Sequence, residues 1–421
     1  MNVGIIGSGG REHAISHSLK NSKKVNTIYC IPGNAGTKEI AINIDIDLKD
    51  FDKIKNLIIE KNIDFLIIGP EKPLVDGLVD FLKDTKVKVF GPNKAASQLE
   101  GSKIFTKNLC KEYNIPTANF GIFQNPLEAK IFLEKSNYPI VIKADGLAAG
   151  KGVYICENIS NAVQAVKEIF NGKFGLAKNV LIEEFLDGEE MSFFIITDGK
   201  TIKKFETAQD HKRVFEGDKG KNTGGMGAYS PSRLINDQLE KKIIEKIINP
   251  TLQGLKDRKI EYVGFLYAGL MIKNNEPYLI EYNVRMGDPE CQTILPKLET
   301  QLLDILLSCT NKTLDKIDIE WSNEKSLCVV VCSNGYPDEY KKNILINNLD
   351  KINLDNKNLC FHAGTVSKDN QILAIGGRVL NFVSLSSSFF SAREKIFNNL
   401  KILNWDHGFF RKDIGYKVID L

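Results

Sequence analysis

The chain has 421 residues, of which 43% are hydrophobic and 26% are charged, ordinary values for a soluble globular protein. Its 56 basic and 53 acidic side chains leave a formal net charge of +3 without a long run of like charge. This balance speaks against nucleic-acid and membrane partners and favours small molecules. The length exceeds one ordinary core and predicts about three domains.

The start of the sequence and its cysteines predict a cytoplasmic protein. Met1 leads directly into the apolar run Val3–Ile6 without a basic leader, and no stretch of eighteen apolar residues follows. The eight cysteines form no CxxC pair, so buried reduced thiols are expected. His13 and His17 share a helical face without the neighbouring Glu of a zinc motif, which favours a packing or capping role.

Residues 1 to 100 alternate short apolar runs with helical periodicity. This alternation predicts an α/β, doubly wound domain with a parallel sheet, whose ligand site lies at the carboxyl ends of the strands. The predicted elements are strands at 3–6, 25–31, 64–69 and 87–90 and helices at 11–20, 50–61 and 74–83.

Three glycine-bearing loops fall at those strand ends, at 7–10, 32–36 and 69–73. A dinucleotide fingerprint is not satisfied, because Glu12 takes the third glycine position. Exposed backbone N–H groups at a helix start still suit one phosphate, although a plain tight turn would also explain the first loop. Together the three loops predict a phosphosugar site formed by Gly9, Gly10, Arg11, Gly33, Asn34, Gly36, Pro70 and Glu71.

A smaller α/β segment extends from about residue 119 to 190 and reads as a lid inserted into a larger domain. Possible hinges flank it at 114–116 and 187–188. Its expected elements are helices at 125–136 and 161–171 and strands at 139–143, 153–156 and 180–184.

The stretch "VIKADGLAAGKGV" at 141–153 resembles a phosphate-binding P-loop but departs from its spacing. Only three residues separate Gly146 from Gly150–Lys151, and Gly152 stands where a P-loop has the hydroxyl that binds magnesium. Lys143 ends an apolar strand, where its long side chain either reaches water or meets an anion.

The rest of the chain predicts a larger sheet and a separate final unit. Strands are expected near 191–197, 201–207, 263–272 and 277–282, and helices near 237–255 and 298–309. A long, polar, glycine-rich segment without secondary structure is expected at 210–231, and a loop of that length is usually functional. Residues 326–421 predict an α+β unit.

The strand at 278–285 alternates its side chains, so Glu281, Asn283 and Arg285 should point the same way. Carboxylate and amide oxygens suit Mg²⁺ beside nucleotide phosphates, and a guanidinium recognises carboxylate or phosphate. A solvated strand face with an ion pair is the competing interpretation. The polar turn that contains Asp288 follows directly and favours the metal–phosphate site.

A second strand end, at 183–186, could recognise a purine base. Backbone groups there could bond an adenine edge while Phe185 or Leu186 packs on the ring, and Glu190 could accept from ribose hydroxyls. Exposed acids such as Glu184 at a strand end are usually just solvated. The order of these features along the chain makes them specific.

That order resembles the ATP-grasp superfamily, and within it the family of phosphoribosylamine–glycine ligases. The matching stretches include "GSGGREHA" at 7–14, "PGNAG" at 32–36, "GPEKPLVDG" at 69–77, "LEGSK" at 99–103, "IPTA" at 115–118, "KADGLAAGKGV" at 143–153, "DHKR" and "NTGGMGAYSP" within 210–231, "EYNVRMGDPE" at 281–290 and "RKDIG" at 411–415. Tyr282 and Met286 stand where the family usually has Phe.

The resemblance implies four parts of the fold and a set of ATP contacts. The parts are an N-terminal phosphoribosylamine-binding domain at 1–101, a large ATP-grasp domain at 102–118 and 190–325, a lid at 119–189, and an α+β domain at 326–421. The loop 145–152 would cover the ATP phosphates. ATP would be bound by Lys103, Lys143, Gly146, Gly150, Lys151, Gly152, Glu183, Glu184, Phe185, Leu186 and Glu190.

The family's activity is ATP-dependent ligation of glycine to 5-phosphoribosylamine through glycyl phosphate, which gives glycinamide ribonucleotide in purine biosynthesis. The resemblance implies Mg²⁺ or Mn²⁺ on Glu281 and Asn283, because the preceding strand, 264–271, offers no second carboxylate. Arg285 and Lys143 would act on the transferring phosphoryl group, and Asp210, His211 and Lys212 would orient glycine or the amine. Gly225 and Asp288 would also contact substrate, and a monomer is expected.

Two other enzyme interpretations and one non-enzyme interpretation remain. Another ATP-grasp ligase, such as a biotin-carboxylase-like or carboxyaminoimidazole-forming enzyme, would lack the 210–231 segment and the N-terminal loops. A non-catalytic nucleotide-binding regulator could lose Glu281 or Arg285, and both are present. A dehydrogenase is the least favoured, because neither part of its fingerprint is satisfied.

Overall fold

The computed structural model describes residues 1–147, 152–175 and 178–419. Its N-terminal sheet is parallel, as the alternation of strands and helices predicts, and has the order β3-β2-β1-β4-β5. The strands are β1 (Asn2–Gly7), β2 (Thr27–Pro32), β3 (Ile42–Asn43), β4 (Ile63–Ile68) and β5 (Lys88–Phe90). Alternate residues of β1 point to opposite faces, so Val3 and Ile5 pack with α1 (Gly10–Leu19), whereas Ile6 packs with α2 (Phe51–Glu60).

The single helix expected at 74–83 is two short helices, α3 (Glu71–Asp76) and α4 (Leu78–Phe81). Gly77 lies between them with φ of 98°, a left-handed conformation that ends α3. Helix α3 begins at Glu71, inside the stretch 69–73 that was expected to be a loop.

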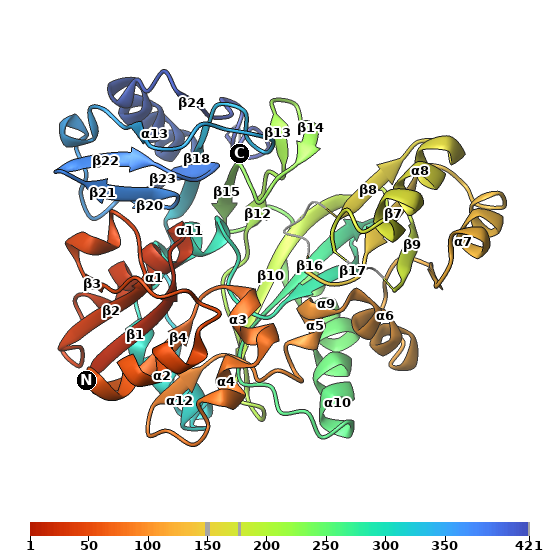
Figure 1. Ribbon diagram of the computed structural model, residues 1–421, viewed down its shortest axis with the longest axis horizontal. Helices are drawn as coiled ribbons and strands as arrows, with labels where there is room; N and C mark the ends of the chain where they lie inside the picture. Colours follow the sequence, from red (N-terminus) through yellow and green to blue (C-terminus); the bar gives the residue numbers. More distant parts are fainter. Residues whose placement is uncertain (148–151, 176–177, 420–421) are drawn as a thin grey trace.

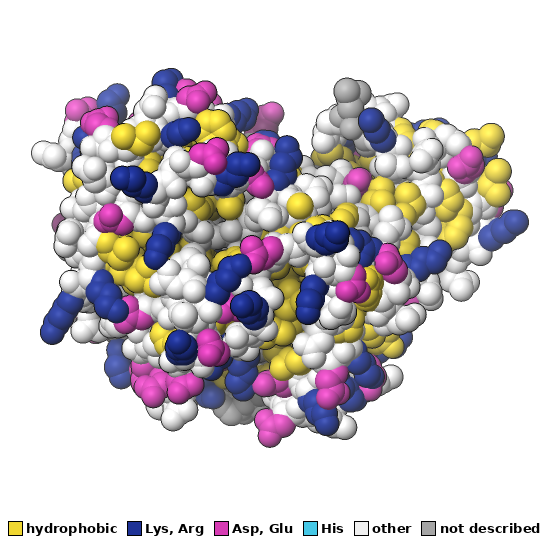
Figure 2. Space-filling model, turned by 90° about the horizontal axis from the view of Figure 1, so that it is seen from below, with side chains coloured by type: hydrophobic (Ala, Val, Ile, Leu, Met, Phe, Trp, Pro, Cys, Tyr) yellow, Lys and Arg dark blue, Asp and Glu magenta, His cyan; other side chains and the backbone are white. Residues whose placement is uncertain are grey.

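The lid forms a projecting lobe with its own sheet, seen at the right of Figure 1. The antiparallel order is β6-β9-β7-β8, from β6 (Phe120–Phe123), β7 (Ile140–Ala144), β8 (Val153–Cys156) and β9 (Val180–Glu184). Helices α7 (Pro126–Leu133) and α8 (Ile159–Phe170) pack together, and α8 covers the sheet. Leu133, Ile142 and Ile169 belong to a hydrophobic core made of lid residues alone. The lobe projects from the body, and hydrophobic side chains lie on its visible face (Figure 2).

The central sheet is antiparallel, with the order β11-β10-β16-β17. Its strands are β10 (Glu189–Thr197), β11 (Ile202–Lys204), β16 (Gly264–Lys273) and β17 (Glu276–Asn283). Helices α5 (Gln98–Gly101) and α6 (Lys103–Glu112) lead into the lid. Helices α9 (Asp237–Ile243) and α12 (Leu302–Thr310) contact the central sheet, whereas α10 (Asn249–Asp257) packs on α6 and α11 (Glu290–Ile294) packs on α1. The helix expected at 237–255 contains a π-helical turn at Ile244–Ile248, just before Pro250, whose nitrogen cannot donate a hydrogen bond.

The expectation of a segment without secondary structure at 210–231 is wrong. Strands β13 (Arg213–Phe215) and β14 (Lys219–Asn222) form a hairpin. Strands β12 (Gln209–Asp210) and β15 (Gly227–Ser230) join the C-terminal sheet, in the order β12-β15-β18-β23-β20, with β18 (Lys325–Ser333), β20 (Asn358–His362) and β23 (Arg378–Ser386). Small residues such as Gly227 and Ala228 lack the apolar bulk that marks a strand in sequence, but they pair with Val329 and Cys328.

The C-terminal unit is completed by α13 (Phe389–Leu403), which packs on β18 and β23. Strand β24 (Gly408–Phe409) pairs with β18, and a small sheet has the order β19-β22-β21, from β19 (Ile344–Leu345), β21 (Thr365–Lys368) and β22 (Gln371–Ala374). One hydrophobic core joins Ile5 of the N-terminal sheet with Tyr267 and Val330, so these units pack against one another. Within the described residues, no helix is both long and apolar enough to cross a bilayer.

Candidate functional site

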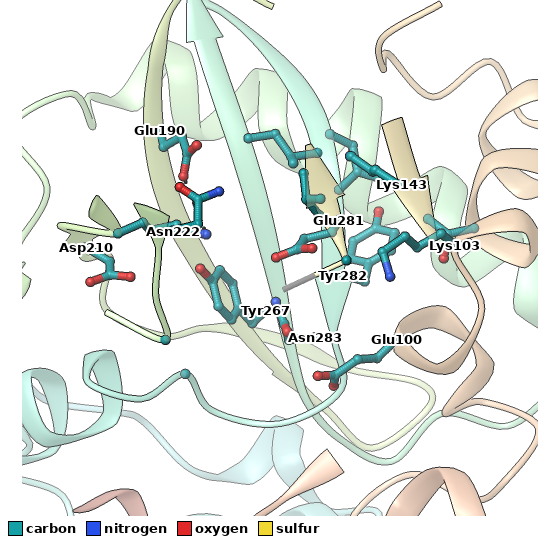
Figure 3. A pocket seen from close by; sticks show the side chains of 18 of the residues that line it. Glu100, Lys103, Lys143, Glu190, Asp210, Asn222, Tyr267, Glu281, Tyr282 and Asn283 are labelled. Atoms are coloured by element: carbon teal, nitrogen blue, oxygen red, sulfur yellow. Dashed lines mark ion pairs between the residues drawn. The ribbon is translucent and has the colours of Figure 1, made fainter. Parts of the chain in front are cut away.

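A cavity of about 490 Å³ lies where the lid, the central sheet, α6 and the C-terminal unit meet. Its charged and polar lining comes from segments far apart in the sequence (Figure 3). The volume is ample for a nucleotide-sized ligand, since ligand pockets usually measure several hundred Å³.

Strand β17 forms one wall of this cavity. Glu281 and Asn283 on β17, and Arg285 just after it, all line the cavity, and Tyr282 between them also contributes to the lining. Tyr282 is 2% exposed, and its hydroxyl binds Thr251 in the core. Burial alone would raise the pKa of Glu281, but Lys212, Lys143 and Lys103 outweigh it and lower that pKa. Glu281 is therefore a carboxylate that faces several cations.

Two acids hold Arg285 in this wall. Its Nη2 lies 2.8 Å from Glu100 Oε1, and its Nε lies 3.3 Å from Glu71 Oε2. Glu100 Oε2 also accepts from the backbone N–H of Val284 at 2.8 Å. Burial raises the pKa of Glu100 to about 7, although Arg285 opposes the shift. Glu100 belongs to the "LEGSK" stretch but was not predicted as a site residue.

Lysine side chains surround the carboxylate of Glu183, which is 4% exposed. Oε2 of Glu183 lies 2.7 Å from Lys143 Nζ, and Oε1 lies 2.9 Å from Lys107 Nζ. Lys103, one helical turn before Lys107 on α6, donates to Gly146 O at 2.8 Å. Lys107 was missed, because a lysine on an amphipathic helix usually faces water.

The other predicted nucleotide contacts surround these lysines. Gly146, Gly152, Phe185 and Leu186 line the cavity, and Phe185 is 38% exposed. Glu184 also lines it, while its carboxylate accepts from the backbone and side-chain N–H groups of Asn119, each at 3.0 Å. Two predicted contacts, Gly150 and Lys151, lie outside the described residues.

Asp210 and Lys212 also line the cavity, together with Glu190, Glu290 and Tyr267, which pairs with Asn283 of β17. Lys212 Nζ pairs with Glu190 Oε2 at 3.4 Å. Asp210 Oδ1 is buried and has no hydrogen-bond partner among the described residues. Burial and the neighbouring Glu290 raise the pKa of Asp210. This pair of acids suits a ligand that carries a positive charge.

His211 lies apart from this wall. Its Nδ1 donates to Gly227 O at 3.1 Å, and its Nε2 accepts from the backbone N–H of Gly415 at 3.3 Å. Burial lowers the pKa of His211 to about 4, and Arg411 adds to the shift. The prediction that His211 orients a substrate therefore does not fit the structure, because both ring nitrogens form hydrogen bonds with the backbone.

Some of the residues predicted in the N-terminal loops line the cavity, and others do not. Arg11, Pro70 and Glu71 line the cavity, as does Asp288. Asn34 instead donates to Ser8 O and His362 O, each at 2.8 Å, at the junction with the C-terminal unit. The predicted glycine contacts are likewise absent from the described lining of the cavity; they are Gly9, Gly10, Gly33, Gly36 and Gly225.

Arg378 of β23 is a further cavity residue that the sequence did not reveal. Its Nη1 donates to Gly224 O and Asp288 O, each at 2.6 Å, and lies 3.3 Å from Asp288 Oδ1. Nothing in its neighbourhood of the sequence distinguishes it from an ordinary strand arginine. The C-terminal unit therefore contributes directly to the cavity wall.

The oxygen donors on β17 fit a hard divalent cation. Neither the carboxylate of Glu281 nor the amide of Asn283 hydrogen-bonds within the described residues, and both face the cavity (Figure 3). The described residues contain no group of three or more His, Cys, Asp or Glu placed to hold a metal. This donor set suits Mg²⁺, which commonly takes one or two protein carboxylates and completes its octahedron with phosphates and water.

Family models match three consecutive parts of the chain. They are described as the N domain of phosphoribosylglycinamide synthetase at residues 1–100, its ATP-grasp (A) domain at 101–291 and its C domain at 326–417. A phosphoribosylamine–glycine ligase of Brucella melitensis is 44% identical over 421 residues, covering 100% of this chain and 99% of the relative.

Solved structures agree in fold. A phosphoribosylamine–glycine ligase of Thermotoga maritima has a TM-score of 0.86 and 33% identity, covering 99% of this chain and 100% of that one. The biotin carboxylase domain of a Hydrogenobacter thermophilus 2-oxoglutarate carboxylase, solved with MgADP and bicarbonate, has a TM-score of 0.73 but 15% identity, covering 95% of this chain and 89% of that one. That second likeness concerns the fold alone.

Proposed function

The chain belongs to the phosphoribosylamine–glycine ligase family, and from this premise we propose how its cavity performs the family's reaction. It is an ATP-dependent ligase that joins glycine to 5-phosphoribosylamine and forms glycinamide ribonucleotide, ADP and phosphate in purine biosynthesis. The observation that carries the proposal is the meeting of Glu281, Asn283 and Arg285 with Lys143 and Lys103 in one cavity.

The reaction needs activation of a carboxylate. A carboxylate oxygen of glycine attacks the γ-phosphorus of ATP, the bond to the bridging oxygen breaks, and ADP leaves. The amine of phosphoribosylamine then attacks the carbonyl carbon of glycyl phosphate, inorganic phosphate leaves with the electrons of the C–O bond, and the amine gives up a proton. Such phosphoryl transfer depends on positioning and charge stabilisation rather than on a covalent protein nucleophile.

ATP is proposed to lie between the lid and the central sheet. Phe185 and Leu186 would pack on the base, Glu190 would accept from the ribose, and Lys143 and Lys103 would bind phosphate oxygens. Gly146 and Gly152 line the cavity beside these lysines. Because acyl phosphates hydrolyse, the lid would also keep water from the intermediate.

Glu281 and Asn283 would hold Mg²⁺ or Mn²⁺. A bound divalent ion supplies charge neutralisation on the phosphate oxygens. Arg285, held by Glu100 and Glu71, would point its guanidinium at the transferring phosphoryl group.

The two small substrates are proposed to occupy the far side of the cavity. Asp210 would bind the ammonium group of glycine, supported by its unpartnered buried oxygen, and Lys212 would orient the carboxylate. Arg11, Pro70, Glu71 and Asp288 would contact phosphoribosylamine: the guanidinium could donate to its phosphate, and the two carboxylates could accept from its amine and hydroxyl groups.

Three finer features stay part of the proposal. The outer domain limits 1–101 and 326–421 are supported by the similar limits of two family models, and the lid at 119–189, inserted between 102–118 and 190–325, is supported by its own hydrophobic core. A cytoplasmic location is supported by eight cysteines without a disulfide. A monomer is proposed because the N-terminal domain, the lid, the central sheet and the C-terminal unit of the same chain all contribute residues to the cavity.

The decisive experiment measures ADP release from the purified protein with ATP and Mg²⁺. We expect steady release with glycine and phosphoribosylamine together and little without glycine. Bicarbonate and D-alanine are offered as alternative acids. Equal ATP hydrolysis with and without glycine, or turnover with bicarbonate instead, would contradict the proposal.

A further inference from the structure

The "RKDIG" segment at 411–415 has no part in the chemistry proposed above, yet it contains the largest fully buried side chain of the described residues, that of Arg411. Arg411 is 1% exposed and does not line the cavity. Its Nη1 donates to Arg213 O at 2.9 Å and lies 2.8 Å from Asp218 Oδ1. Both partners belong to the β13–β14 hairpin at 213–222.

Asp413 completes this attachment. Its Oδ1 accepts from Arg411 Nε at 2.8 Å, and its Oδ2 accepts from Arg411 Nη2 at 2.7 Å and from the backbone N–H of Gly217 at 2.8 Å. Gly217 and Asp218 form the tip of the hairpin, whereas Arg213 lies at its base. The Arg411–Asp413 pair therefore fixes the hairpin at both ends.

Few apolar side chains of the hairpin are buried, so hydrophobic packing does little to hold it in place. Phe215 is 60% exposed, and β14 is exposed at three of its four residues. Val214 is its one buried aliphatic side chain. Because hydrophobic burial is small here, the polar contacts of Arg411 and Asp413 should determine where the hairpin lies.

The end of β14 enters the cavity wall. Asn222, Thr223 and Gly224 line the cavity, and Asn222 lies near Glu190 in Figure 3. The backbone N–H of Thr223 donates to Lys212 O at 2.8 Å, so the hairpin and the lysine proposed for glycine are joined directly. Arg378 binds Gly224 O from the other side.

We propose that Arg411 and Asp413 are positioning residues for the glycine side of the cavity. They hold the hairpin so that Lys212 and residues 222–224 keep their places in the wall. This inference rests on the proposed function, because it takes Lys212 as a residue that orients glycine. The proposal gives the C-terminal segment 411–415, which lies outside the cavity, a role in the affinity for glycine.

The test compares KM values for glycine and ATP in three single variants and in the double variant that combines Arg411→Lys with Asp218→Asn. Arg411→Lys keeps the positive charge but loses the planar fork that reaches several acceptors at once. Asp218→Asn removes the charge at the hairpin tip and is the second variant if Arg411→Lys fails to fold. Arg258→Lys is the matched control, because Arg258 binds Glu112 and Gly254 O and contacts neither the hairpin nor residues 411–415.

We expect a rise of about fivefold or more in KM for glycine in both hairpin-contact variants, while KM for ATP changes less than about twofold. The double variant should raise KM for glycine by less than the product of the two single effects, because both changes remove the Arg411–Asp218 contact. An equal rise of both KM values, or a lower melting temperature with unchanged KM for glycine, would overturn the inference. If the unaltered protein shows no glycine-dependent ADP release, it is the proposed function that fails.

Discussion

Glu183 binds Lys143 through a buried ion pair of 2.7 Å between Oε2 and Nζ. The same carboxylate holds Lys107 at 2.9 Å, so one acid orients a lysine of the lid and a lysine of α6. Burial opposes the charge on Glu183, but the two lysines outweigh it and lower its pKa. Glu183 thus orients the lysine proposed for phosphate binding.

Replacing Glu183 by Gln should weaken ATP binding and stability together. Removing one member of a buried ion pair costs about 3–5 kcal/mol, because the remaining charge is left without a counter-charge. We expect KM for ATP to rise about tenfold while KM for glycine changes little. Glu168→Gln is the control, since Glu168 pairs with Lys173 on the lid surface. Normal KM for ATP in Glu183→Gln would contradict this role.

Replacing Glu281 by Ala should abolish ligation and leave the fold intact. Loss of the carboxylate removes a metal donor and a charge opposite several lysines, so we expect kcat to fall by about 10³-fold. The unfolding free energy should stay within about 1 kcal/mol, because a residue that faces the cavity packs little. Glu276→Gln on the same strand is the control, since Glu276 forms surface ion pairs with Lys242 and Lys246. Near-normal turnover in Glu281→Ala would refute the metal assignment.

Glu100 should act through Arg285. Glu100→Ala removes the acceptor for Arg285 Nη2 and for the N–H of Val284, and we expect kcat/KM to fall about 10–100-fold, as for other orienting partners in active sites. Glu100→Gln should lose less, because its amide oxygen still accepts one of the two hydrogen bonds. Steady-state kinetics with Glu112→Gln as an exposed control on α6 measures the effect. Equal activity of Glu100→Ala and the unaltered protein would rule out the orienting role.

Buried histidines should make the protein sensitive to mild acid. Burial lowers the pKa of His211 and of His362 from 6.5 to about 4. Above pH 6.5 neither the native nor the unfolded chain binds a proton at these two histidines. Between pH 6.5 and about 4 the unfolded chain is protonated there and the native chain is not. As the pH is lowered through this range, the unfolding free energy therefore falls by up to about 1.4 kcal/mol per pH unit for each histidine.

Denaturant unfolding at pH 7, 6 and 5 measures this slope. His211→Gln should lower stability at every pH but flatten the slope, because one proton-binding difference is lost. His407→Gln is the control, since His407 is exposed. The same slope in His211→Gln and in the unaltered protein would show that His211 does not contribute.

Local periodicity predicted much of the fold and one wall of the site. The two-residue spacing of strand geometry relates Glu281 to Asn283 along β17, whereas Arg285 lies just beyond the strand and is held by Glu100 and Glu71. The N-terminal parallel sheet followed from strands alternating with helices. These inferences succeeded because each depends on neighbouring residues.

The parts that sequence did not reveal depend on contacts between distant segments. Lys107 reads as a solvated helix lysine until Glu183 is brought beside it, and Arg378 reads as a strand residue until Asp288 meets it. His211 is of a residue type that is often catalytic, but its ring is hydrogen-bonded to Gly227 of β15 and to Gly415. When the residue that buries a side chain lies far away in the sequence, the sequence around that side chain does not indicate the burial.

The pairing of β15 with β18 has a consequence for synthesis. Residues Gly227–Ser230 leave the ribosome about a hundred residues before their partners Val329–Ser326, so the nascent chain must carry an unpaired strand edge over that interval. A fragment that ends before residue 326 would keep this edge permanently open to pairing with another molecule. We expect such a fragment to aggregate, and the protein to resist division into two separately expressed halves at this point.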